Sequence, residues 1–89
     1  MKLLISFEVL KGYDHFKEVF ISMESKRKEA GIETIYAGKE AKNENVVHVC
    51  LEVESMEIIQ EFMQRPENAE IQKGAGVNRE SQVMIPIIE

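Results

Sequence analysis

The chain has 89 residues, enough for one domain but too few for two separate hydrophobic cores. Its net charge of −5 disfavours binding to nucleic acids and to anionic membrane surfaces, which are themselves negatively charged. The single cysteine, Cys50, has no partner for an intramolecular disulfide, so we expect a reducing compartment, the cytoplasm. We expect one domain over residues 1–89, with no targeting segment or membrane span visible at its start.

The first half of the chain predicts a strand, a helix and a second strand. Apolar residues alternate with others from Lys2 to Val9, which is the period of a strand with one buried face. They then recur at helical spacing from Phe16 to Ala30, and Gly31 ends this helix because glycine readily adopts the left-handed conformation of a helix terminus. Residues 32–40 favour extended structure and lead into a polar turn over residues 41–45.

The second half repeats the order of strand, helix and strand. The alternation from Val46 to Val53 is the clearest in the chain. A helix follows from Met56 and is interrupted at Pro66, which has no backbone N–H to donate, and its second piece ends at the glycines of residues 74–76. Alternation returns in the last strand around residues 82–88, where a proline indicates the edge of a sheet.

This order of elements is typical of the split βαβ, or ferredoxin-like, fold of the α+β class. It predicts a four-stranded antiparallel sheet in the order 4-1-3-2 with two helices on one face. The face expected beneath the helices is apolar: Leu3, Ile5, Phe7, Val9, Val47, Val49, Leu51, Val53, Val83, Ile85 and Ile87. The opposite face is mixed: Leu4, Ser6, Glu8, Thr34, Tyr36, Val46, His48, Cys50, Glu52, Gln82, Met84 and Ile88.

The mixed face predicts a homodimer. It is too apolar for full solvation and too polar for a sealed core, as expected of an interface between two sheets. A chain of this length also buries only about 60% of the surface that its unfolded form exposes, so its core is marginal. Pairing of two copies through the sheet face opposite the helices supplies the missing burial.

Four segments carry a resemblance to a known superfamily: residues 30–38, 46–53, 65–69 and 74–77. Through them the whole chain resembles the dimeric α+β barrel proteins, in which two ferredoxin-like sheets pack face to face, and within these a branch of small bacterial proteins of unassigned function. Other branches include cofactor-free monooxygenases of quinol-like aromatics, haem-degrading enzymes and lactone isomerases. The four segments mark turns, helix ends and packing, so the resemblance implies a fold and a dimer but no particular activity.

His48 is the leading candidate for chemistry, because an imidazole titrates near neutral pH and can act as an acid or a base. In the predicted strand order, Ser6 and Glu8 lie near His48 and Cys50 on the mixed face. Glu8 could then orient His48 to take a proton from a phenol or quinol, with Tyr36 or Ser6 as a hydrogen-bond donor. We favour the alternative of a histidine hydrogen-bonded at a dimer interface, because no familiar catalytic triad accompanies it.

The mixed face also supplies the candidate ligand-binding residues Ser6, His48, Cys50 and Met84. We expect no metal there, since a structural zinc site needs four ligands and the chain has neither a cysteine pair nor a histidine cluster. Cys50 is better interpreted as a buried, inert thiol. No resident cofactor is expected, although haem binding through His48 or His15 is a third hypothesis.

Two functions are therefore carried forward. The first is a non-catalytic or small-molecule-binding dimer, with a small apolar ligand either inside the barrel or in the cleft between helices and sheet. The second is an enzyme resembling the cofactor-free monooxygenases, with His48 as the proton acceptor. The enzyme requires His48 to lie within hydrogen-bond reach of a polar partner and to face a space large enough for an aromatic ring.

Overall fold

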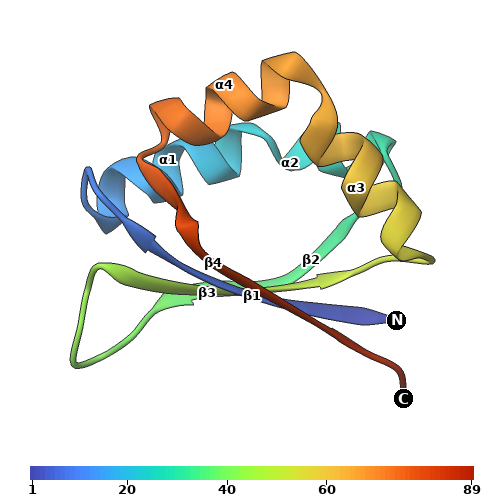
Figure 1. Cartoon of the computed structure of the whole chain (residues 1–89), viewed down its shortest axis with the longest axis horizontal. Helices are drawn as coiled ribbons and strands as arrows, with labels where there is room; N and C mark the ends of the chain where they lie inside the picture. The colour runs from blue at the N-terminus through green and yellow to red at the C-terminus, as the bar shows by residue number, and fades with distance from the viewer.

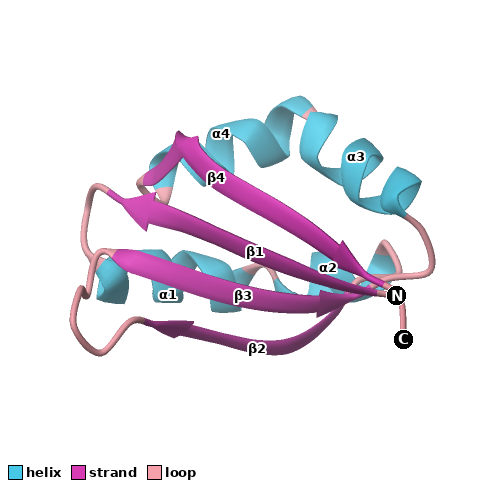
Figure 2. Ribbon diagram, turned by 60° about the horizontal axis from the view of Figure 1, so that its bottom comes forward, coloured by secondary structure: helices cyan, strands magenta, loops and turns pink.

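Four strands and four helices make up the computed structural model, which describes residues 1–89 (Figure 1). In chain order they are β1 (Lys2–Val9), α1 (Tyr13–Ser22), α2 (Glu24–Glu29), β2 (Glu33–Lys39), β3 (Val46–Glu52), α3 (Met56–Gln64), α4 (Pro66–Gly74) and β4 (Val77–Ile87). The strands form one antiparallel sheet in the order β2-β3-β1-β4, with all helices on one face (Figure 2). The predicted α+β ferredoxin-like fold and strand order are confirmed. No helix has the length and apolar character needed to cross a bilayer.

Each of the two predicted helices is divided into two pieces. The division between α3 and α4 falls at Pro66, as predicted from its missing N–H. The division between α1 and α2, at Met23, was not predicted. There the Ser22 hydroxyl donates to the Val19 carbonyl oxygen at 2.6 Å. The Met23 N–H therefore donates to the carbonyl of Phe20, three residues back, instead of to that of Val19, four residues back. A serine side chain that competes for a helix carbonyl in this way tightens and ends the turn.

The core lies between the sheet and the helices, where two central strands were predicted to bury alternate residues. Leu3, Ile5, Phe7 and Val9 of β1, and Val47, Val49, Leu51 and Val53 at β3, are each 7% exposed or less. They pack with Phe16 of α1 and Ile59 of α3 in a single cluster. The alternation of β1 and β3 therefore identified the correct buried face.

The predicted orientation of β4 is wrong. Glu8 pairs with Asn78, but Ser6 pairs with Val83. A step of two residues along β1 is thus matched by a step of five along β4, so β4 contains three extra residues there, an odd number. An odd register shift moves every following side chain to the other face of the sheet. The apolar residues Val83, Ile85 and Ile87, expected beneath the helices, lie on the opposite face and are 51%, 51% and 39% exposed. Gln82 and Met84 lie on the helix side instead.

A second bulge, in β2, corrects the placement of Thr34. Thr34 pairs with Leu51 and Tyr36 pairs with Cys50, so β2 contains one extra residue between them. Thr34 thus shares the helix side of the sheet with Leu51, where its hydroxyl accepts a hydrogen bond from Arg27 Nε at 3.3 Å. Tyr36 lies on the opposite face with Cys50, as predicted.

Candidate functional site

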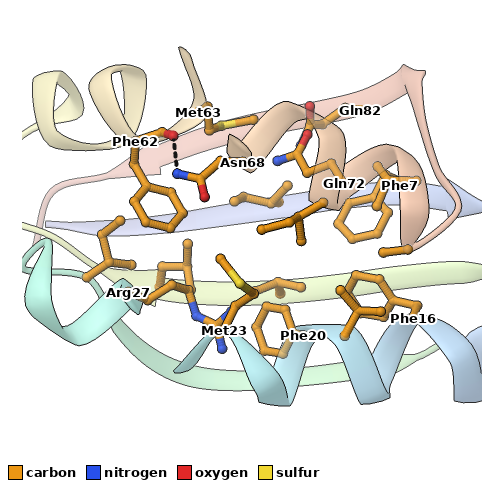
Figure 3. Close-up of a pocket in the computed structure, with 18 of the residues that line it drawn as sticks. Phe7, Phe16, Phe20, Met23, Arg27, Phe62, Met63, Asn68, Gln72 and Gln82 are labelled. Atoms are coloured by element: carbon orange, nitrogen blue, oxygen red, sulfur yellow. Dashed lines mark hydrogen bonds between the residues drawn. The ribbon is translucent and has the colours of Figure 1, made fainter. Parts of the chain in front are cut away.

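A cavity of about 120 Å³ lies between the sheet and the helices (Figure 3). Its floor comes from β1 and β3, and its walls come from α1 and α2 on one side and α3 and α4 on the other. Most of its lining is apolar, with aromatic rings contributed by Phe7, Phe16, Phe20 and Phe62. Protein interiors rarely leave voids larger than a water molecule, so an apolar space of this size is a candidate binding site.

Asn68 is a buried polar residue on the wall of this cavity, 5% exposed. Its position follows from Pro66: in a continuous helix the Phe62 carbonyl accepts a hydrogen bond from the N–H four residues on, and proline has none. The side chain of Asn68 supplies the missing donor, because its Nδ2 donates to the Phe62 oxygen at 2.7 Å. Its other amide atom, Oδ1, is buried with no hydrogen-bond partner.

Gln72 lies one turn further along α4 and also lines the cavity. Residues four apart share one face of a helix, so the side chains of Asn68 and Gln72 are neighbours on the same wall. Gln72 Oε1 is buried and without a hydrogen-bond partner. The mostly apolar cavity, whose lining also includes the Gln82 amide, therefore has two unpaired carbonyl oxygens on the α4 side (Figure 3).

Arg27 lies on the opposite wall and is 6% exposed. The central carbon of its guanidinium lies 3.8 Å from the centre of the Phe20 ring, and its Nη2 contacts Glu24 Oε2 at 3.4 Å. Burial lowers the pKa of Arg27, and the charge of Glu24 and its hydrogen bond partly oppose that shift. The guanidinium is thus paired with Glu24, Thr34 and the face of Phe20.

His48 lies on the other face of the sheet, away from the cavity. Its Nε2–H donates to Glu40 Oε2 at 2.6 Å, because a carboxylate can only accept, and both side chains are nearly half exposed. The carboxylate that contacts His48 is therefore Glu40, whereas Glu8 was predicted for this role. Glu8 is exposed opposite Val46.

The other predicted site residues are divided between the two faces. Ser6 pairs with His48 across β1 and β3, while Cys50, a free thiol 2% exposed, pairs with Tyr36. Met84 pairs with Ile5 and packs against the core on the helix side, so its predicted place on the mixed face is wrong. No group of three or more histidine, cysteine or acidic side chains gathers to hold a metal ion.

Sequence reasoning missed Asn68 and Gln72. The local signal was present, since Pro66 deprives Phe62 of its donor and a nearby asparagine can replace it. What could not be inferred is that Oδ1 of this asparagine then points into a cavity, because the opposite wall comes from residues 40 and more positions away in the chain.

Comparison with known proteins relates the chain to others by fold. No family model matches the sequence. No curated protein matches it either. A candidate antibiotic biosynthesis monooxygenase from Caulobacter crescentus superposes with a TM-score of 0.71 at 15% identity, over 99% of this chain and 89% of that one. A second from Nitrosomonas europaea gives 0.69 at 10% identity over 100% of both chains.

A third structure, of the protein YJCS, superposes with a TM-score of 0.64 at 16% identity, over 99% of this chain and 100% of that one. Folds can be shared by proteins with unrelated activities, and at these identities the likeness carries no residue roles. The chain therefore has the ferredoxin-like fold of these monooxygenase-type structures over its whole length.

Proposed function

We propose that this protein binds a small, largely apolar molecule in the cavity between its helices and its sheet. The cavity of about 120 Å³ is the observation that carries the proposal. At about 24 cal/mol per Å³, an enclosed empty cavity of this volume costs roughly 3 kcal/mol of folding free energy, which is an upper bound for this partly open one. Small domains have about 5–15 kcal/mol in total, so such a cost favours a functional space over a packing defect. An engineered cavity of about 150 Å³ with a similar lining binds benzene.

The proposal is tested with toluene as an apolar probe, followed by NMR on the isotope-labelled protein. We expect the signals of cavity residues such as Ile59 and Ile71 to shift on titration, and those of His48 to stay in place. Ala75→Leu places a larger side chain in the cavity wall and should weaken toluene binding at least tenfold. Ala41→Leu, in an exposed turn, is the matched control. Equal binding by the Ala75→Leu protein would refute the cavity as the site.

The proposed assembly is a homodimer that pairs the sheet faces opposite the helices. The corrected orientation of β4 supports it, because Val83 and Ile85 are each half exposed there, alongside Tyr36, which is 53% exposed. An apolar strip of this kind on a monomer is typical of an interaction surface. A second copy of the chain would cover it and bury Ser6 and His48 at the interface, next to Cys50, which is already buried.

The cytoplasm is the proposed location. Cys50 is free and buried, so the fold contains no disulfide that an oxidising compartment would maintain.

A second candidate function is oxidation of a quinol-like aromatic at His48. Two observations favour it: the 2.6 Å contact between His48 and Glu40, and the fold shared with the candidate monooxygenases from Caulobacter crescentus and Nitrosomonas europaea. With Nε2–H donating to Glu40, Nδ1 of the neutral imidazole is the nitrogen free to accept a substrate proton. His48 is half exposed, so this site needs the dimer partner to enclose it.

Oxygen uptake separates the two candidates. The binding function predicts no oxygen consumption above background when the protein is mixed with a hydroquinone. The enzyme predicts consumption that falls at least a hundredfold in His48→Ala, the usual contribution of a general base. Uptake that persists unchanged in His48→Ala would remove His48 from the mechanism.

A further inference from the structure

We infer that the cavity selects neutral ligands that bear a hydroxyl group, of the alcohol or phenol type, over hydrocarbons and carboxylates of the same size. This inference rests on the proposed binding function and specifies the chemistry of its ligand. It follows from the two unpaired carbonyl oxygens, Asn68 Oδ1 and Gln72 Oε1, on one wall of a mostly apolar space.

Asn68 is fixed as an acceptor. The amide of an asparagine can in general be turned to present either its oxygen or its nitrogen. Here Nδ2 is held by its 2.7 Å hydrogen bond to the Phe62 carbonyl, which can only accept, so Oδ1 must face the other way. Figure 3 shows this oxygen pointing away from Phe62 toward the space between the helices. A buried acceptor that the protein itself leaves unpaired is satisfied by a ligand that brings a donor.

Gln72 is adaptable where Asn68 is fixed. Its Oε1 has no hydrogen-bond partner, so no contact at that atom determines which end of the amide faces the cavity. A ligand hydroxyl both donates and accepts. It can donate its hydrogen to Asn68 Oδ1 while Gln72 turns its Nε2–H₂ group onto the hydroxyl oxygen. A hydrocarbon can do neither, so it leaves Asn68 Oδ1 unpaired.

The charges around the cavity disfavour an anionic ligand. The one cation on its lining, Arg27, is engaged by Glu24, Thr34 and the ring of Phe20 on the opposite wall. A carboxylate placed against α4 would meet the negative end of the fixed Asn68 carbonyl dipole, and the amide of Gln72 alone cannot replace the hydration that the carboxylate would lose. The class that fits is therefore uncharged, of about the size of one ring, with a hydroxyl directed toward α4.

The experiment compares phenol, toluene and benzoate, which share one ring, by NMR titration of the full chain. We expect phenol to bind about tenfold more tightly than toluene, the factor that one additional hydrogen bond of ordinary strength supplies. Benzoate should bind more weakly than either. In Gln72→Met the preference for phenol over toluene should fall to about threefold or less, because half of the hydroxyl contact is lost.

Gln60→Met is the matched control, since Gln60 is an exposed glutamine on α3, and it should keep the full preference. Gln72→Met should also raise the urea midpoint of unfolding, because it removes a buried acceptor that has no partner. Should Gln72→Met raise this midpoint and still keep the full preference for phenol, Gln72 has no part in recognition and the inference is overturned. Equal binding of phenol and toluene overturns it while leaving the proposed function intact, whereas failure of both to bind overturns the proposed function itself.

Discussion

The guanidinium of Arg27 lies 3.8 Å from the centre of the Phe20 ring, so the charged residue of α2 stacks on an aromatic residue of α1. This contact joins the two pieces of the divided helix across Met23. It also explains how a charged side chain can be 94% buried, because the ring, the Glu24 carboxylate and the Thr34 hydroxyl together stabilise the charge of the guanidinium. A planar guanidinium can make all three contacts at once, whereas an ammonium group cannot.

Arg27→Lys should lower the free energy of unfolding by about 1–2 kcal/mol, because it keeps the charge but loses the planar stack and the Nε donor to Thr34. Urea denaturation measures the change. Arg79→Lys, at an exposed position of β4, should change it by less than about 0.5 kcal/mol. If the two variants were equally stable, the stack would contribute nothing.

Asn68→Ala should destabilise the protein by about 1–3 kcal/mol, because the Phe62 carbonyl then loses the donor that replaces the missing N–H of Pro66. Gln64→Ala removes a side-chain amide from an exposed site on the neighbouring helix and serves as the control. Thermal unfolding followed by circular dichroism compares the two. A loss as small as that of the control would mean that solvent, and not Asn68, satisfies this carbonyl.

Leu3→Ala should cost about 2–5 kcal/mol, since Leu3, near the start of β1, is completely buried and its truncation leaves a cavity. Leu10→Ala makes the same chemical change at a residue that is 68% exposed, and it should cost far less. Urea denaturation of both variants provides the comparison, and we expect the free energy of unfolding to depend on urea concentration with the same slope in each. Similar midpoints would contradict the assignment of the helix side of β1 as the core.

Gly76→Ala should destabilise the protein by more than about 1 kcal/mol. Gly76 has φ of 84°, and a Cβ built there would lie 2.9 Å from Lys11 Cβ, closer than side chains pack. Gly38→Ala is the control, because a Cβ at Gly38 meets nothing within 4 Å and its backbone is not left-handed. Stability equal to that of Gly38→Ala would show that the turn from α4 into β4 can relax.

Ile85→Lys should convert a dimer into a monomer in analytical ultracentrifugation, because it places a charge on the strip proposed to meet the second copy. Ile21→Lys introduces the same charge at a residue that is 58% exposed on α1, away from that strip, and should leave the sedimentation unchanged. A wild-type chain that sediments as a monomer at micromolar concentration would refute the dimer.

The surroundings of the candidate site were only partly predictable, as β4 illustrates. Alternation in β4 correctly indicated a strand and its proline correctly indicated an edge, but apolar character was wrongly equated with burial beneath the helices. The bulge that reverses the strand is held by the Ser81 hydroxyl, which donates to the Asn78 oxygen and accepts from the Glu8 N–H. Hydrogen bonds between segments more than 70 residues apart leave no periodic signal.

The sequence by itself determined the order of the elements, the buried faces of β1 and β3 and the break at Pro66, because periodicity and backbone chemistry act within a few residues. Only the tertiary structure decided that Val83 and Ile85 face outward, that Glu40 contacts His48, and that Asn68, with an unpaired buried oxygen, lies on the wall of a cavity. These depend on how distant segments pair and pack, and in the sheet a one-residue change of register is enough to turn a side chain to the other face.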